Sequence, residues 1–201
     1  MKTHLYLVRH GETDWNKERR FQGHKDIPLN EKGICQAERL ANWLKDHSFG
    51  AIYSSDLIRA VKTAEILAVP HGLEVLQRKE LRERNMGDWE GIHIEEIEAA
   101  NPTWRTQIED ELWCHRFGIE PVQRMCQRII HFLNKLVEKH PGNTLLVVSH
   151  GGLINGALYE LGQGKFGKMK LKNTSVTQLV HSQDHGWEVI QAGVSDHLSE
   201  I

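Results

Sequence analysis

Short, wholly apolar segments that alternate with amphipathic segments constrain the fold of this chain more than any other feature. Residues 5–8, 51–54 and 144–149 are runs of strand length with almost no charged side chain. Residues 31–44 and 122–137 instead place apolar residues at helical spacing, which predicts helices with one buried face. Strands that are apolar throughout need cover on both faces. We therefore predict an α/β three-layer sandwich, with a mainly parallel central sheet and helices on both faces.

Weaker patterns complete the predicted order of elements. They predict a helix that begins after Ser55 or Asp56 as its N-cap, a strand at 73–76, helices at 92–100, 103–113 and 152–161, and two or three edge strands from about residue 170. The chain has 201 residues, without internal repeats or a Gly/Ser/Pro linker. We therefore expect one domain over residues 1–201, with a lid-like segment at about 92–121.

The charge balance limits the classes of partner. Lys plus Arg number 25 and Asp plus Glu number 27, giving a formal net charge of −2. Such a balance provides no field for nucleic acid or an anionic membrane surface, so a bound anion needs a local cluster of cations. The N-terminal apolar run is too short for a signal sequence or a bilayer span, which predicts a cytoplasmic protein. The three cysteines are expected to be reduced, buried thiols. The oligomeric state stays open.

Two predicted strands end in the same way. One runs into Arg9-His10-Gly11 and the other into His150-Gly151. A glycine at such a point lets the backbone approach a ligand closely, and ligands bind beyond the carboxyl ends of parallel strands. One histidine alone would be read as a surface residue, but two in matching contexts indicate a shared site.

Two further charged residues are ambiguous when judged alone. Arg59 lies about one turn into the helix predicted after residue 56. A cation there is disfavoured by the helix dipole, by roughly 0.3–1 kcal/mol when it is exposed. Arg59 is therefore either a solvated arginine that tolerates this effect or a residue that shares an anion with the helix amides. Glu83, in a charge-rich loop, reads as a surface carboxylate.

Taken together, the motifs resemble a known family. Leu7-Val8-Arg9-His10-Gly11-Glu12-Thr13 is similar to the entry motif of the histidine phosphatase superfamily, the phosphoglycerate-mutase-like enzymes. Further matches in the same order are Asn16, Gln22-Gly23, Asp26, Pro28-Leu29, Gly33, Gln36-Ala37, Tyr53-Ser54-Ser55, Arg59-Ala60, Thr63-Ala64-Glu65, Glu83, Gly87–Gly91, Ser149-His150-Gly151 and Asn173–Thr177. The resemblance is greatest to the PhoE-type broad-specificity phosphatases, with the α-ribazole phosphatases next.

The resemblance implies a phosphomonoester hydrolase that forms a phosphohistidine on small-molecule phosphates. His10 would be the nucleophile and Glu83 the general acid and then the base. The transferring phosphoryl group would be surrounded by Arg9, Arg59 and His150, with further hydrogen bonds from Asn16, Gln22 and an amide of Gly23 or Gly151. Two arginines that stay protonated can neutralise the phosphoryl charge, so we expect neither a metal ion nor a cofactor.

Two other functions stay open. One is a cofactor-dependent phosphoglycerate mutase. Those enzymes carry a longer insertion after the Glu83 region, for which this chain has little room, so release to water is favoured. The other is an inactive family member that serves as a binding module. The filled positions Arg9, His10, Arg59, Glu83 and His150 argue against it.

Several remaining features have competing explanations. The chain has 13 histidines, but their spacing matches no metal motif. The other histidines, among them His24, His47, His71, His93, His115, His131 and His140, read as scattered surface residues. Residues 162–168 match a phosphate-binding loop pattern but follow a helix and lack the Ser or Thr, which predicts an exposed loop. Trp104, Trp113 and Phe117 either line the substrate pocket or pack the lid onto the body.

Overall fold

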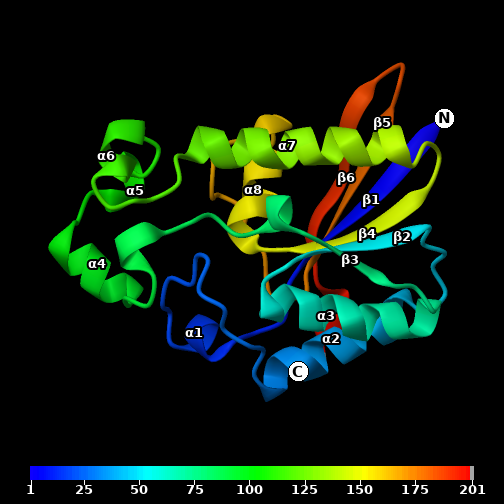
Figure 1. Ribbon diagram of the computed structural model, residues 1–201, viewed down its shortest axis with the longest axis horizontal. Helices are drawn as coiled ribbons and strands as arrows, with labels where there is room; N and C mark the ends of the chain where they lie inside the picture. Colours follow the sequence, from blue (N-terminus) through cyan, green and yellow to red (C-terminus); the bar gives the residue numbers. More distant parts are fainter. Residues whose placement is uncertain (200–201) are drawn as a thin grey trace.

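The computed structural model, which describes residues 1–199, has one six-stranded sheet (Figure 1). Its strands are β1 (Lys2–Arg9), β2 (Ala51–Ser55), β3 (Val75–Arg78), β4 (Thr144–Ser149), β5 (Val176–Ser182) and β6 (Gly186–Val194). They are ordered β3-β2-β4-β1-β5-β6, and only β5 runs against its two neighbours. The predicted α/β fold with a mainly parallel sheet is confirmed.

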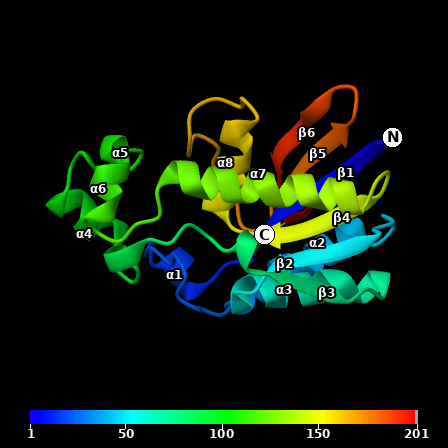
Figure 2. The same ribbon diagram turned by 45° about the horizontal axis from the view of Figure 1, so that its top comes forward.

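Helices cover both faces of this sheet, as predicted. Helices α7 (Val122–Lys139) and α8 (Gly151–Glu160) cover one face, and α2 (Glu31–Leu44) and α3 (Ile58–Ala68) cover the other (Figures 1 and 2). The remaining helices are α1 (Asp14–Lys17), α4 (Ile94–Ala100), α5 (Trp104–Gln107), α6 (Glu111–His115) and the 3-10 turns η1 (Val69–His71), η2 (Lys79–Leu81), η3 (Gly87–Trp89) and η4 (Asp196–Leu198).

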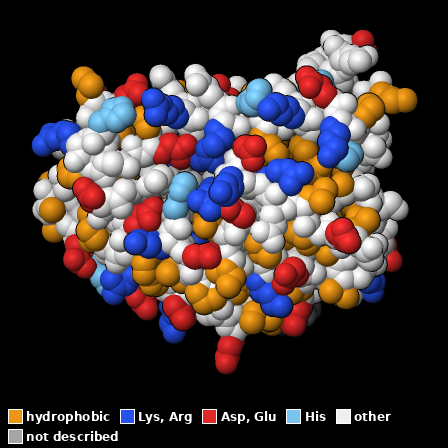
Figure 3. Space-filling model, in the orientation of Figure 1, with side chains coloured by type: hydrophobic (Ala, Val, Ile, Leu, Met, Phe, Trp, Pro, Cys, Tyr) orange, Lys and Arg blue, Asp and Glu red, His pale blue; other side chains and the backbone are white. Residues whose placement is uncertain are grey.

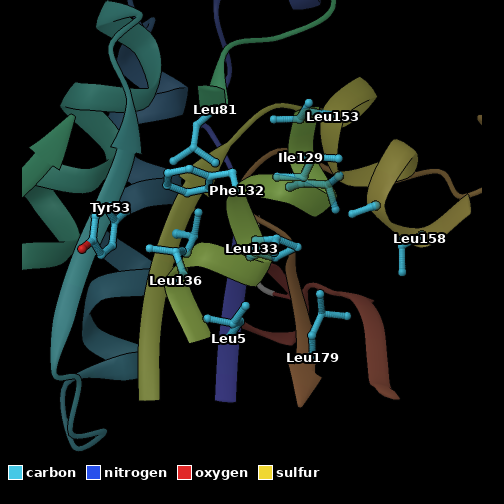
Figure 4. Close-up of a cluster of buried hydrophobic side chains, with 14 of the residues drawn as sticks. Leu5, Tyr53, Leu81, Ile129, Phe132, Leu133, Leu136, Leu153, Leu158 and Leu179 are labelled. Carbon is cyan, nitrogen blue, oxygen red and sulfur yellow. The ribbon is translucent and has the colours of Figure 1, made fainter. Parts of the chain in front are cut away.

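The alternation of side chains along the central strands divides the core into two clusters. Leu5 and Leu7 of β1 face α7 and α8, whereas the next residue, Val8, faces α2 and α3. On the α7 side, Leu133 and Leu136 pack against the sheet beside Leu5 (Figure 4). Leu133 is fully buried, so its truncation to alanine should destabilise the fold by about 2–5 kcal/mol.

The segment at 92–121 lies apart from the sheet, beyond the carboxyl ends of its central strands (Figures 1 and 2). It has its own apolar cluster, in which Trp89 contacts both Trp104 and Trp113 edge to face. The prediction of one helix over 103–113 is wrong. Two short helices occur there because Asp110 accepts a hydrogen bond from the Trp113 amide and begins α6 as a new helix.

The first residues of two helices show how far the local sequence determines the N-cap. Asn30 caps α2 through the Gly33 amide, directly before the predicted helix at 31–44. The N-cap expected at Ser55 or Asp56 is wrong: α3 begins at Ile58, and its first amide donates to Asp26 Oδ1 at 2.6 Å. This carboxylate comes from a loop 32 positions earlier in the chain.

Other differences from the sequence predictions are small. Strand β3 begins at Val75 rather than at residue 73. Two strands follow residue 170, of which β5 lies inside the sheet because β1 pairs with it. Cys114 and Cys126 are buried as predicted, but Cys35 is exposed, on the outer side of α2. No helix within residues 1–199 is long and apolar enough to cross a bilayer.

Candidate active site

A cavity of about 430 Å³ lies between the carboxyl end of β1 and the segment at 92–121. Of the residues predicted for the site, it is lined by Arg9, His10, Asn16, Gln22, Gly23, Arg59 and Glu83. His150 and Gly151 lie just behind the wall, with the His150 ring 5.1 Å from the His10 ring between centroids. The fold therefore brings together residues that are up to 142 positions apart in the chain, Arg9 and Gly151.

The His10 ring is held in one orientation and one tautomer. Its Nδ1 lies 2.7 Å from the carbonyl oxygen of Gly11. A carbonyl can only accept, so Nδ1 carries the proton and Nε2 keeps its lone pair. Burial, together with the neighbouring Arg59 and Arg9 charges, places the pKa of His10 well below its ordinary value. The imidazole is therefore neutral near pH 7, with a free nitrogen that can attack an electrophile.

His150 has the same electrostatic environment but no fixed hydrogen bond. It is fully buried, and neither ring nitrogen has a partner within residues 1–199. Burial and the charge of Arg59 lower its pKa well below the ordinary histidine value. Two unpartnered nitrogens in a buried ring favour an acceptor or donor from a ligand, because unpaired buried polar groups are costly.

Backbone carbonyls position the two arginines predicted for the site. Arg9 donates from Nη1 to the Leu171 carbonyl at 2.6 Å. Arg59, the second residue of α3, donates to the carbonyls of Lys25 and Gly23. Neutral carbonyls leave the guanidinium charges unbalanced, and the Nε atoms of both arginines are buried without a partner in the described chain.

Burial lowers the pKa of Arg59 to about 10, with Glu83, Asp26 and Glu90 opposing the shift. The side chain therefore remains a cation near pH 7. Two neighbouring cations, each with a buried and unused Nε–H group, form a site for an anion the size of a phosphoryl group.

The Glu83 carboxylate is fixed by two backbone amides. Oε1 accepts from the Arg84 amide at 2.8 Å and Oε2 from the Gly152 amide at 3.0 Å. A Cβ on Gly152 would overlap Oε1, so only glycine permits this approach. Gly152 was not among the predicted site residues, although the Gly151-Gly152 pair was a signal for it.

Asn16 and Gln22, the two side-chain amides predicted for the site, have polar atoms that are available to a ligand. Asn16 Oδ1 accepts from the backbone and hydroxyl of Thr13 and from Asn173 Nδ2. This leaves Asn16 Nδ2 available to a ligand. Gln22 is buried, and its Oε1 has no partner in residues 1–199. Gly23 has a positive φ of 49°, and a Cβ there would overlap the Glu90 carboxylate.

Several histidines are not the scattered surface residues that the sequence predicted. His24 Nε2 lies 2.8 Å from the Glu83 carbonyl and thus supports the loop that carries this carboxylate. His47 and His71 each contact Phe49 and are half-buried. His140 lies 2.9 Å from the Tyr53 hydroxyl. Spacing in the sequence carried no signal for these contacts, because each joins different elements.

The outer wall of the cavity comes from the segment at 92–121 and from two loops. Trp104 lines the cavity and its Nε1 is buried without a partner among residues 1–199, whereas Trp113 and Phe117 pack against Trp89. Trp104 therefore borders the cavity, whereas Trp113 and Phe117 belong to the apolar cluster around Trp89 rather than to the core on either face of the sheet. Phe166 also lines the cavity, from the loop at 162–168, which is otherwise exposed as predicted.

Three arginines outside the predicted set add charge to this wall. Arg20 pairs with Glu18, and Arg105 pairs with Glu98 while stacking on Trp104. Arg84 is buried, and it donates to the carbonyls of Glu120 and Ile108 and to Cys114 Sγ. Its Nη1 has no hydrogen-bond partner in the part of the chain that the structure describes.

On the face drawn in Figure 3, acidic and basic side chains are interspersed. Within residues 1–199, no group of three or more His, Cys, Asp or Glu side chains could hold a metal ion. The local concentration of arginines in the cavity therefore defines an anion site in a nearly neutral chain.

Comparison with known proteins identifies the family of this chain. Residues 5–194 match the model of the histidine phosphatase superfamily (branch 1), and the chain belongs to this family. The chain is 37% identical over 206 residues to phosphoglycerate mutase-like protein 4 of Arabidopsis thaliana, covering 98% of this chain and 87% of that protein.

Solved structures of phosphatases are similar over nearly the whole chain. The phosphoserine phosphatase of Entamoeba histolytica in complex with 3-phosphoglyceric acid has a TM-score of 0.85 and 31% identity, covering 98% of this chain and 99% of that one. A mycobacterial glucosyl-3-phosphoglycerate phosphatase in complex with VO3 has a TM-score of 0.86 and 32% identity, covering 96% and 99%. Family and neighbours together support an enzyme that acts on small-molecule phosphates.

Proposed function

We propose that this protein hydrolyses small phosphomonoesters through a phosphohistidine formed on His10. The observation that carries the proposal is the Nδ1 contact with the Gly11 carbonyl, which leaves Nε2 unprotonated beside the half-buried Arg9 and the fully buried Arg59. Residues 1–201 would act as one catalytic domain in the cytoplasm, with the segment at 92–121 as a lid over the substrate. The chemistry calls for no metal ion and no cofactor.

In the first step, His10 Nε2 attacks phosphorus and the bond to the ester oxygen breaks. The Glu83 carboxyl gives its proton to the leaving alkoxide, so the alcohol departs neutral. Arg9, Arg59 and His150 hold the equatorial oxygens, whose charge they stabilise in a loose transition state. Because these donors are already in position, little energy is needed to reorient them during the reaction.

In the second step, water attacks the phosphohistidine. The Glu83 carboxylate accepts a proton from that water, the oxygen bonds to phosphorus, and the bond to Nε2 breaks. Inorganic phosphate leaves, His10 is again neutral and Glu83 is again protonated. Donors from Asn16, Gln22 and the amide of Gly23 or Gly151 would complete the hydrogen bonds to the phosphoryl group in both steps.

The size of the cavity and the donors of its outer wall favour phosphate esters with a short organic group. The cavity of about 430 Å³ is in the range of small-ligand pockets. Trp104 presents a buried Nε1–H there without a partner among residues 1–199, and the Arg84 guanidinium lines the same wall. The solved neighbours named above include complexes and activities with phosphorylated carboxylic acids. We infer that such acids belong in the first panel of candidate substrates.

The experiment that tests this function measures inorganic phosphate from a panel of phosphomonoesters, ranked by kcat/KM. It includes p-nitrophenyl phosphate, phosphoserine, α-ribazole phosphate and 3-phosphoglycerate. We expect phosphate release from 3-phosphoglycerate with little 2-phosphoglycerate. Efficient isomerisation driven by 2,3-bisphosphoglycerate would instead establish the mutase function that the name of the Arabidopsis relative suggests. Binding of the phosphates without turnover would indicate an inactive binding module.

A further inference from the structure

The turn η4 lies against α2 and reaches Thr174, in the loop before β5. Trp43 of α2 lies 6.0 Å from the ring of His197 between centroids. On its other side, His197 Nε2 lies 3.0 Å from the Thr174 hydroxyl. The proposed chemistry assigns no role to these residues.

Thr174 directly supports the backbone of the nucleophile. Its amide donates to the carbonyl of Arg9 at 2.9 Å and approaches that of His10 at 3.3 Å. The preceding side chain, Asn173 Nδ2, donates to the same His10 carbonyl at 2.9 Å. Arg9 and His10 both line the cavity. Because residues 173–174 hold their carbonyl groups, they fix the backbone from which these two side chains extend.

The conformation of Thr174 needs support from its surroundings. Its φ is +59°, in the left-handed region, which is a genuine outlier for a β-branched residue and is energetically unfavourable. Such a conformation persists only where neighbouring contacts over-determine it. Thr174 is fully buried, and its hydroxyl donates to the Asn173 carbonyl at 2.7 Å.

The hydrogen-bond directions follow from this donation. A hydroxyl has one proton, and Thr174 gives it to Asn173, so the contact with His197 requires the imidazole to donate from Nε2. Nδ1 is then the unprotonated nitrogen, and it is buried without a partner among residues 1–199. Burial also lowers the pKa of His197, which agrees with a neutral ring.

We propose that His197 is a positioning residue for the active site, whose Nε2–H holds the Thr174 hydroxyl and thereby the backbone of Arg9 and His10. The effect on turnover rests on the proposed phosphatase function, whereas the effect on Thr174 does not. Displacement of a catalytic group by about 1 Å from a remote change can lower the rate by about a hundredfold. The hydrogen bond from His197 acts on Arg9 and His10 only through Thr174, so its loss should have a smaller effect and lower kcat by about tenfold.

The test compares His197→Leu with His197→Gln. The Nε2 of glutamine lies as many bonds from Cα as the Nε2 of histidine, so it can donate to Thr174. We expect His197→Leu to lower kcat about tenfold with little change in KM, and His197→Gln to restore most of the activity. The matched control, His185→Leu in the exposed β5–β6 turn, should behave like wild type. Equal losses in the Leu and Gln variants would overturn the positioning role.

A double-mutant cycle adds the partner. Thr174→Val removes the hydroxyl and keeps the branched shape. If His197 acts through Thr174, the double variant should be no slower than Thr174→Val alone, and additive losses would contradict the proposal.

Hydrogen exchange at the Thr174 amide gives a readout that needs no activity. We expect faster exchange in His197→Leu than in wild type and His197→Gln. This result would stand even if the wild-type protein hydrolysed no phosphomonoester. Unchanged exchange in the leucine variant would overturn the proposal whatever the catalytic function is.

Discussion

The two ends of the cavity are built in different ways. At the sheet end, backbone carbonyls or amides fix the side chains assigned to the chemistry: His10 through Gly11, Arg59 through Lys25 and Gly23, and Glu83 through the Gly152 amide. At the lid end, Arg20 and Arg105 also pair with carboxylates of other side chains, although Arg20 and Arg84 donate to backbone carbonyls as well. The wall there includes the aromatic rings of Phe21, Trp104 and Phe166.

This difference assigns phosphoryl transfer to the sheet end of the cavity and the selection of substrates to the lid end. Groups held by the backbone keep their positions whichever substrate is bound, so they suit a phosphoryl group that is common to all substrates. A wall of side chains that contact one another can be altered without disturbing the sheet. Changes at the sheet end should therefore lower turnover of every substrate, whereas changes at the lid end should alter the ranking of substrates.

The largest effect is expected for His10→Ala. Removal of the nucleophile should lower kcat for every phosphomonoester by at least about a thousandfold, with the fold intact by circular dichroism. The matched control is His4→Ala, which changes an exposed histidine at the other end of the same strand. A folded His10→Ala protein with near wild-type turnover would refute the assignment of the sheet end to chemistry.

Glu83→Gln should have the next largest effect, and it should depend on the leaving group. Loss of the general acid should slow alkyl phosphates by about a hundredfold to a ten-thousandfold, and p-nitrophenyl phosphate less, because its leaving group needs less protonation. Comparison of kcat for the two substrate types measures this. Glu80→Gln, at an exposed position three residues earlier, serves as the control. Equal losses on both substrate types would argue against proton donation by Glu83.

Trp104→Phe tests the lid end with a smaller change. It keeps the aromatic ring in the cluster and removes the Nε1–H that is buried without a partner among residues 1–199. We expect kcat/KM to fall about threefold to tenfold for substrates with an acceptor in the leaving group, and to stay unchanged for p-nitrophenyl phosphate. Trp113→Phe, in the same cluster but outside the cavity lining, is the control. A uniform loss on all substrates would contradict the division of roles.

The smallest expected effect is a dependence of stability on pH. Burial first, and the charge of Arg59 next, lower the pKa values of His10 and His150 well below 6.5. Below about pH 6.5 the unfolded chain therefore binds more protons than the folded protein, and the free energy of unfolding falls as the pH falls. Urea midpoints between about pH 7.5 and pH 5 measure this. The double variant His10→Gln/His150→Gln should show a shallower decline, and an identical decline would contradict the buried neutral state.

Part of this site could be predicted from local patterns. His10 and His150 each follow an apolar strand and precede a glycine. This local pattern was enough to predict that the two histidines share a site. Glu83 had no such signal, and only the family resemblance singled it out. Asp26 replaced the expected local cap of α3, and Phe166 entered the cavity from a loop that was expected to be merely exposed. These contacts join distant segments, and the sequence pattern around each residue does not contain its partner.

The central claim is that phosphoryl transfer passes through His10 Nε2, and trapping the intermediate tests it most directly. Wild-type protein is mixed with a rapidly cleaved phosphomonoester, quenched within milliseconds at alkaline pH, digested, and analysed by mass spectrometry. We predict one phosphoryl adduct, on His10, attached at Nε2, that appears before inorganic phosphate and is absent in His10→Ala. Phosphate release without any protein-bound phosphoryl group, or an adduct on another residue, would contradict the mechanism.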